Sequence, residues 1–191
     1  QMCIRDRKNV LVKGFQGLIL LPEIGLATQF EKKFIEFFNF KPAIWHSGIT
    51  KKNKKIIWEG IIRGKISVVI GARSSLFLPF KNLGLIIVDE EHDQSYKQDD
   101  GVIYNARDMA ISRALFEKVP INLITSVPSL ETYVNIKKKK YKSSRLEQRY
   151  QNASLPNFEI INLNRVKMQK QSWLSKELSL IHISEPTRHL L

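Results

Sequence analysis

The sequence predicts an α/β fold, with one parallel sheet that carries helices on both faces. Short apolar runs alternate with longer amphipathic stretches from Gly17 onward, which is the order of strands and helices in such folds. The chain has 191 residues and 43% of them are hydrophobic, enough to bury the core of one α/β domain and a piece of another.

The first half of the chain predicts two strand–helix pairs. A buried strand is expected at 17–21, and the stretch 26–38 carries phenylalanines at helical spacing, a stripe typical of a core-facing helix. A second short strand is expected at 42–45. A helix follows at 51–63 and is stopped by Gly64.

The second half predicts three more strands and two helices. Strands are expected at 66–70 and 83–88, and the second of these is the most continuous apolar run, which favours a central position in the sheet. A helix at 106–117, a strand at 121–124 and a helix at 130–136 complete the pattern.

The charge balance favours a polyanionic partner. The formal net charge is +13, which points to nucleic acid first and to an anionic membrane second. The lysine-rich stretches 51–55 and 137–142 are each typical of a solvated face or loop. Cys3 is the one cysteine, so no disulfide framework is expected. No apolar run approaches the roughly 20 residues of a membrane span and no secretory signal is visible, so we expect a cytoplasmic protein.

Both ends of the sequence look foreign to the rest. Residues 1–7 and 179–191 resemble translated sequencing-adapter sequence. We therefore leave them out of the fold analysis, as one leaves out an expression tag.

Polar residues follow every predicted strand, and the acidic cluster after the fourth is the most informative. Carboxyl ends of parallel strands meet at one edge, where ligands bind. Two adjacent carboxylates, Asp89 and Glu90, at a strand end suit a nucleotide hydrolase: the first holds Mg²⁺ and the second orients the attacking water. Glu91 and His92 could pass the nucleotide state to other parts. The alternative for the acidic cluster is a plain solvated turn. A two-metal nuclease is disfavoured, because it needs further carboxylates after other strands and only Glu23 is found there.

The ordered motifs resemble those of the primosomal replication-restart helicases, a family of superfamily 2 DNA helicases. Each motif alone is weak evidence for the family, but the ordered set is specific. The resemblance runs from about Lys8 to Leu178. In chain order the motifs are LPEIGL (21–26), HSG (46–48), IGARSSLF (70–77), PFKNLG (79–84), DEEH (89–92), DQSYKQ (93–98) and YNARD (104–108).

The resemblance implies a RecA-like P-loop NTPase lobe of a helicase that uses ATP and Mg²⁺ and moves 3′ to 5′ on DNA. Such proteins restart stalled replication forks and assemble the primosome with proteins that load the replicative helicase. Residues 8–150 would form most of the first ATP-binding lobe, and 151–178 would begin the second.

The resemblance also implies roles for single residues. Asp89 would bind Mg²⁺ and Glu90 would be the catalytic carboxylate, with Glu91 and His92 also at the nucleotide. Tyr96 and Tyr104 could instead pack in the core, and Arg73 could pair with a carboxylate. The positions implied to face DNA are Glu23, Gln29, Arg73, Ser74, Tyr96, Lys97, Tyr104 and Arg107, and those implied to couple DNA to hydrolysis are Thr125 and Ser126.

The sequence departs from the family pattern in several places. The phosphate-binding loop, G-x-x-x-x-G-K-S/T, belongs before Lys8 in the family's motif order and does not occur in the 191 residues, so we expect this chain alone to be inactive. Val127 stands where the family's Ser-Ala-Thr motif has threonine. Val102 and Ile103 replace an aromatic and a basic residue of the family's aromatic-rich loop. The family's zinc module also has no counterpart in these residues.

Two other functions stay open from the sequence. One is a lobe of another superfamily 2 motor, such as a restriction translocase or an RNA helicase. The other is a basic nucleic-acid-binding module without catalysis, which the charge supports but which does not require Asp89 and Glu90 at a strand end.

Overall fold

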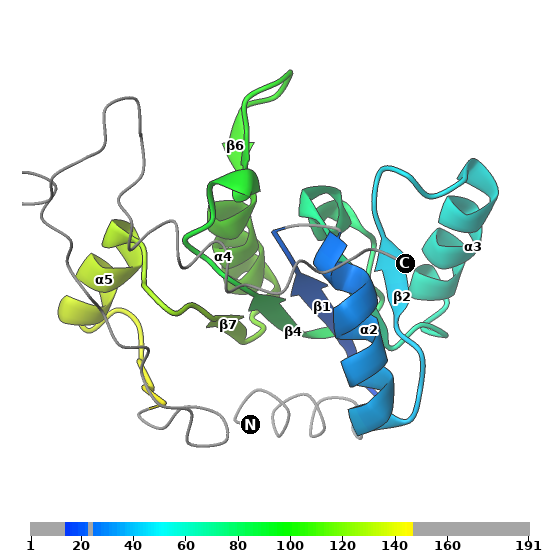
Figure 1. Cartoon of the computed structure of the whole chain (residues 1–191), viewed down its shortest axis with the longest axis horizontal. Helices are drawn as coiled ribbons and strands as arrows, with labels where there is room; N and C mark the ends of the chain where they lie inside the picture. The colour runs from blue at the N-terminus through cyan, green and yellow to red at the C-terminus, as the bar shows by residue number, and fades with distance from the viewer. Residues whose placement is uncertain (1–13, 23–24, 147–191) are drawn as a thin grey trace, which may run out of the picture. The chain divides into compact units, whose positions relative to one another are not determined.

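The computed structural model describes residues 14–22 and 25–146 (Figure 1). The chain divides into two compact units, 1–143 and 144–191, and every described helix and strand lies in the first. The expected boundaries at 7/8, 150/151 and 178/179 lie outside the described residues, as do both adapter-like ends.

Five parallel strands form the main sheet. Neighbouring strands pair in parallel throughout, in the order β2-β3-β1-β4-β7, so the predicted parallel sheet is confirmed. The strands are β1 (Gln16–Leu20), β2 (Ala43–Trp45), β3 (Val68–Gly71), β4 (Leu83–Val88) and β7 (Ile121–Leu123).

The expectation that the fourth strand is central was wrong by one position. β4 pairs with β1 on one side and β7 on the other, but β1 is the middle strand of the five. A continuous apolar run reports burial on both faces of a strand, and both β1 and β4 satisfy that condition.

Helices cover both faces of the sheet, as predicted. Successive residues of β1 point to opposite faces, so Leu18 and Leu20 join one core cluster while Ile19 and Leu21 join another. The first cluster includes residues of α3 (Lys51–Ile62) and α4 (Ala106–Glu117), and the second includes residues of α2 (Gly25–Phe38). The predicted helix and strand bounds agree with the observed ones to within two residues.

Several short elements were not predicted. They are the 3₁₀ helices η1 (Arg73–Phe77) and η2 (Gln94–Tyr96), and an antiparallel hairpin of β5 (Lys97–Gln98) and β6 (Tyr104–Asn105). Figure 1 shows this hairpin projecting beyond the start of α4. Two-residue strands are too short to show an apolar period, which is why sequence analysis missed them.

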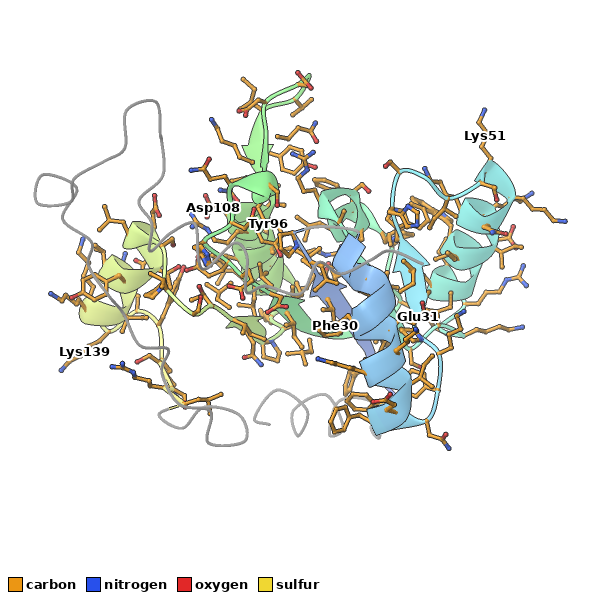
Figure 2. All side chains as sticks on the ribbon, in the orientation of Figure 1. Phe30, Glu31, Lys51, Tyr96, Asp108 and Lys139 are labelled. Carbon is orange, nitrogen blue, oxygen red and sulfur yellow. The ribbon has the colours of Figure 1, made fainter. Side chains whose placement is uncertain are left out.

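The lysine-rich stretches lie at the surface. Lys51 begins α3 and Lys139 follows α5 (Leu130–Lys137), and both side chains point outward (Figure 2). Their exposure fits the expected solvated faces. Within the described parts of the chain, no helix has both the length and the apolar character that crossing a membrane requires.

Gln16 holds the amino-terminal edge of the sheet together. Its side chain is 2% exposed, and its Nε2 donates to the carbonyl oxygens of Ile61 (3.1 Å) and Ile66 (2.7 Å). Its Oε1 accepts from the backbone N–H groups of Lys81 (2.8 Å) and Asn82 (3.1 Å). The amide uses two donors and two acceptor sites, so the end of α3 and the segments before β3 and β4 are tied to β1.

We predict that Gln16→Leu lowers the free energy of unfolding by about 3 kcal/mol, because four backbone groups lose their buried partner while the side-chain volume stays similar. Urea denaturation of the 191-residue chain measures this change. Gln94→Leu, at an exposed position of η2, is the control and should change stability by less than about 0.5 kcal/mol. Equal losses in the two variants would contradict the role of Gln16.

Candidate functional site

The loop after β4 lies at the carboxyl edge of the sheet, between the ends of its two neighbours. The backbone N–H of Asp89 donates to Leu20 O at the end of β1 (3.0 Å). The N–H of Glu91 donates to Ile124 O, just after β7 (3.0 Å). The loop is therefore held on both sides, which fixes the backbone positions from which the Asp89 and Glu90 side chains extend.

Glu90 lies between these two anchors in a strained backbone conformation. Its φ is +45°, in the left-handed region that costs a non-glycine residue about 1–2 kcal/mol. Its carbonyl accepts from Asp93 N (2.8 Å), which closes a tight turn. Strain of this kind persists only where the surroundings enforce it, and it gathers at functional sites.

The carboxylate of Glu90 has a free acceptor oxygen. Among the described residues, Oε2 is buried and has no hydrogen-bond partner; His92 Nδ1 lies 3.6 Å away. The described residues also contain no cluster of three histidine, cysteine or acidic ligands. The two adjacent carboxylates of Asp89 and Glu90 suit Mg²⁺, which keeps most of its water and takes one or two carboxylates.

Thr125 contacts the acidic loop through His92. The Thr125 hydroxyl lies 2.6 Å from His92 Nδ1, donates to Val127 O (2.7 Å) and accepts from Val127 N (3.2 Å). Which of the two groups donates in the contact between His92 Nδ1 and Thr125 Oγ1 depends on the tautomer of the histidine. The Val127 side chain is 65% exposed, so its backbone, rather than its side chain, takes part in this link. Ser126 is exposed beside it.

The structure does not place Tyr96 where a base could stack on it. Its ring is fully buried, and its hydroxyl lies 2.6 Å from Asp89 O and 3.0 Å from Leu20 O. Burial raises the pKa of the Tyr96 hydroxyl, and the charges of Asp89, Asp93 and Glu90 raise it further. The predicted DNA contact is corrected to the alternative, a packed tyrosine that supports the backbone of the acidic loop.

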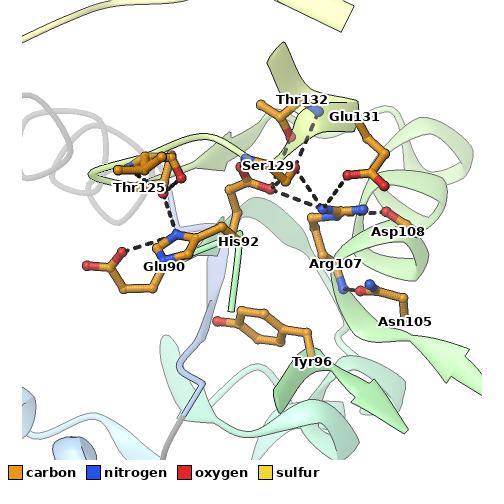
Figure 3. Close-up of polar contacts among 12 residues, drawn as sticks. Glu90, His92, Tyr96, Asn105, Arg107, Asp108, Thr125, Ser129, Glu131 and Thr132 are labelled. Atoms are coloured by element: carbon orange, nitrogen blue, oxygen red, sulfur yellow. Dashed lines mark hydrogen bonds and ion pairs between the residues drawn. The ribbon is translucent and has the colours of Figure 1, made fainter. Parts of the chain in front are cut away.

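Glu91 and Arg107 face each other inside the fold. The resemblance implies instead that Glu91 lies at the nucleotide and that Arg107 faces DNA. Glu91 is 1% exposed and Arg107 is 7% exposed. Arg107 Nη1 donates to Glu91 Oε2 (3.3 Å) and to Ser129 Oγ (2.9 Å), and Arg107 Nε donates to Asp108 Oδ1 (2.8 Å; Figure 3). Glu91 therefore meets other side chains in place of a nucleotide, and Arg107 is not a surface contact for DNA.

The Glu91 carboxylate receives further donors from the start of α5. Oε1 accepts from Ser129 N (2.7 Å), and Oε2 accepts from Ser129 Oγ (2.9 Å) and Thr132 Oγ1 (3.0 Å). Burial by itself lowers the pKa of Arg107, but the hydrogen bond to Asp108 and the charges of Asp108, Glu91 and Glu131 outweigh it and raise that pKa. The pair is thus a buried ion pair with its hydrogen bonds made.

Four of the remaining expected DNA positions, Arg73, Ser74, Lys97 and Tyr104, lie on η1 and the hairpin. Arg73 Nη1 donates to Lys97 O (2.5 Å), so it binds a carbonyl and not the core carboxylate of the alternative. Ser74 Oγ accepts from Trp45 Nε1 (3.2 Å), and Lys97 Nζ pairs with Asp99 (3.0 Å). Glu23 lies outside the described residues, and the Gln29 side chain is not described.

Tyr104 has an aromatic neighbour that the sequence analysis did not single out. The rings of Phe77 and Tyr104 pack edge to face at 5.5 Å, and Phe77 is 54% exposed. The other missed residue, Ser129, had a visible signal: a serine immediately before a predicted helix is a typical N-cap, and its Oγ accepts from Thr132 N (3.3 Å).

Comparison with known proteins agrees with the motif analysis. The model of the DEAD/DEAH box helicase family matches residues 3–133. The replication restart protein PriA of Rickettsia felis is 58% identical over 170 residues, which are 89% of this chain and 26% of that protein. PriA of Bacillus subtilis is 35% identical over 179 residues, 93% of this chain and 22% of that protein. The resemblance to the replication-restart helicases is confirmed, and the chain spans about a quarter of the length of these relatives.

RecG bound to a three-way DNA junction is 26% identical and has a TM-score of 0.43, covering 64% of this chain and 15% of RecG.

We predict that Tyr96→Phe lowers the free energy of unfolding by about 1–2 kcal/mol, because Asp89 O and Leu20 O lose the one buried O–H donor that they share. Thermal denaturation of the chain measures this. Tyr133→Phe removes a hydroxyl from a 44% exposed ring and should change stability by less than about 0.5 kcal/mol.

The pH dependence of stability provides a second test of the Tyr96→Phe variant. A raised pKa keeps Tyr96 neutral in the fold, so its contribution is complete below the unfolded tyrosine pKa of about 10 and is lost as pH rises beyond it. The decline above pH 10 should be shallower in Tyr96→Phe. An unchanged decline together with unchanged stability would show that the hydroxyl does not support the loop.

Proposed function

The chain belongs to the DEAD/DEAH box helicase family, and on that basis we propose that it forms part of the ATP-hydrolysing motor of a DNA helicase that restarts stalled replication forks. The observation that carries the proposal is the end of β4. It presents Asp89 and Glu90 in sequence at the carboxyl edge of a parallel sheet, and Glu90 keeps an acceptor oxygen without a hydrogen-bond partner among the described residues.

The two carboxylates would divide the work of hydrolysis. We propose that Asp89 holds Mg²⁺, which when bound with ATP neutralises charge that develops on the phosphates. Glu90 would accept a hydrogen bond from the attacking water at Oε2 and orient it. The left-handed backbone at Glu90 and the anchors on either side fix the direction from which this oxygen is offered.

His92 and Thr125 would carry the coupling that the family assigns to its Ser-Ala-Thr motif. His92 lies beside both the Glu90 carboxylate (3.6 Å) and the Thr125 hydroxyl (2.6 Å). A shift at Glu90 therefore reaches the segment before α5 through one ring. The threonine hydroxyl that Val127 lacks is supplied two residues earlier by Thr125, and Ser126 would assist from the surface.

DNA would lie along η1 and the hairpin. Arg73, Ser74 and Lys97 bring a cation, a hydroxyl and a second cation to this surface, which suits phosphate oxygens, and Tyr104 adds a ring for bases. The net charge of +13 favours the same ligand. On the motif resemblance alone, we propose that Glu23 and Gln29 also face DNA.

The finer activities rest on likeness to the replication restart proteins. We propose 3′-to-5′ movement on forked or single-stranded DNA, assembly of the primosome with replicative-helicase loading proteins, and a cytoplasmic location. The zinc of the family would be bound outside these 191 residues. The likeness to the replication restart proteins favours this function over that of a different superfamily 2 motor. The next experiments separate it from the other alternative, a basic module that only binds nucleic acid.

We predict that Glu90→Gln lowers DNA-stimulated ATP turnover by about 100-fold or more in the full gene product, while the KM for ATP changes little, because the amide cannot activate water as the carboxylate does. Asp89→Ala should raise the Mg²⁺ concentration required. A coupled ATPase assay with single-stranded DNA measures both, and Glu36→Gln on the exposed face of α2 is the control.

The 191-residue chain gives a matched test. It contains no G-x-x-x-x-G-K-S/T sequence, so its turnover should not exceed that of the Asp89→Ala, Glu90→Ala double variant. Unchanged turnover in Glu90→Gln would contradict the assignment of Glu90 as the catalytic carboxylate. Salt-dependent DNA binding in the full gene product with no ATP turnover would favour the binding module.

A further inference from the structure

Trp45 joins the end of β2 to η1. Its side-chain Nε1 donates to Ser74 Oγ (3.2 Å), and its backbone O accepts from Ala72 N (3.2 Å). The Trp45 residue is 9% exposed, whereas Ser74 lies at the surface. A buried donor therefore reaches outward to an exposed hydroxyl on the helix that also carries Arg73.

The close approach of β2 and η1 depends on Gly71, the last residue of β3. A Cβ atom at this position would lie 2.6 Å from Trp45 O and 2.7 Å from the Ser75 side chain, which is closer than Cβ atoms approach other heavy atoms in folded proteins. Glycine therefore lets η1 come near enough for the indole to reach Ser74. The next serine, Ser75, is buried and donates to Ala72 O (2.7 Å), so its hydroxyl is used within η1.

The indole N–H determines how the Ser74 hydroxyl can be used. An indole nitrogen is only a donor, so the Ser74 oxygen is the acceptor and its own proton is left for another group. Within the described part of the chain, that proton has no acceptor. A hydroxyl that accepts one hydrogen bond is also a stronger donor, because neighbouring hydrogen bonds polarise one another. Ser74 is thus prepared to donate to an acceptor from outside the chain.

The groups around Ser74 favour an acceptor with a negative charge. Lys54 Nζ lies 5.9 Å from the centroid of the Trp45 ring. Arg73 precedes Ser74 in the chain, and its Nη1 is held on Lys97 O (2.5 Å). A phosphate oxygen is a charged acceptor, and arginine, lysine and serine side chains are common donors to phosphate in DNA complexes. The surroundings therefore suit the phosphate backbone of DNA.

We propose that Trp45 is a positioning residue for DNA: its indole N–H holds the Ser74 oxygen, so that the Ser74 proton is directed to a phosphate oxygen of single-stranded DNA. This inference rests on the proposed function, which places DNA along η1. It adds a buried residue that acts on DNA only through the hydroxyl of Ser74.

The first test measures how tightly the 191-residue chain binds fluorescently labelled single-stranded DNA, by anisotropy at low salt. Ser74→Ala should weaken binding about tenfold, the effect of losing a hydrogen bond to a charged group. Trp45→Phe keeps an aromatic ring and removes the N–H, and it should weaken binding about threefold, because a misdirected hydroxyl loses part of that bond. The double variant should bind no more weakly than Ser74→Ala, because the indole acts only through the hydroxyl.

Three further variants separate this role from a general loss of structure. Trp58→Phe makes the same change in a ring that packs 6.5 Å from the Trp45 ring and makes no hydrogen bond among the described residues. Ser67→Ala makes the same change at an exposed serine just before β3. Both should bind DNA within about twofold of wild type. Ser74→Thr keeps the hydroxyl and should bind more tightly than Ser74→Ala.

A spectroscopic test does not require the Trp45→Phe variant to fold. The chain has three tryptophans, so Trp58→Phe and Trp173→Phe identify the indole N–H signal of Trp45 in a proton–nitrogen NMR spectrum. Addition of single-stranded DNA should shift the Trp45 signal more than the Trp58 signal, because only the Trp45 N–H shares an oxygen with the phosphate contact. The shift should be lost in Ser74→Ala.

Each outcome decides one claim. A Trp45 signal that does not move when DNA binds, or losses that add in the double variant, would overturn the role of Trp45 and leave DNA binding by η1 intact. Wild-type affinity in Ser74→Ala would overturn the hydroxyl contact itself. A wild-type chain that does not bind single-stranded DNA would remove the proposed DNA surface, and this inference with it.

Discussion

Glu91 accepts four hydrogen bonds inside the fold, and the carboxyl edge of the sheet is arranged around them. A buried ion pair does not by itself make a protein more stable than apolar packing of the same volume would, but loss of one partner costs about 3–5 kcal/mol. What the carboxylate contributes is geometry, because its acceptor directions set where Arg107, Ser129 and Thr132 can lie. The loop after β4, the start of α4 and the start of α5 are thereby placed relative to one another.

Buried polar side chains hold the two edges of the sheet in different ways. At the amino edge, Gln16 gives four backbone groups their partners and leaves nothing exposed for chemistry. At the carboxyl edge, Tyr96 and Glu91 hold the loop on either side of Glu90, while Glu90 Oε2 keeps no hydrogen-bond partner among the described residues. The strain and the unpaired oxygen coincide in one residue, which is where a hydrolase needs a fixed acceptor.

Much of the sheet and the position of the acidic loop could be predicted from the sequence. Apolar runs indicate the strands, and polar residues at the strand ends indicate the site. The strand 83–88 and the carboxylates after it follow from pattern alone, and the helix 106–117 was predicted with its observed bounds. Tyr96 and Arg107 were predicted to face DNA at the surface, but both are buried. Both flank a hairpin whose strands have two residues each, and without that hairpin the side-chain directions could not be assigned.

Other errors have the same physical origin. Glu91 was grouped with Asp89 and Glu90 because adjacent acids look alike in a sequence, whereas the left-handed backbone at Glu90 turns its neighbour into the core. Gln16 gave no signal, since one amide at the start of a strand is ordinary until its four partners are placed. Ser129 did carry a signal, the N-cap position, which sequence reasoning left unused.

Hydrogen–deuterium exchange of the 191-residue chain, wild type against Glu91→Gln, tests most directly whether one carboxylate holds these segments together. If it does, exchange in Glu91→Gln is faster in 89–93, 104–108 and 125–132 together, with β1 and β3 unchanged. Faster exchange confined to 89–93, with the other two segments as protected as in wild type, would contradict it.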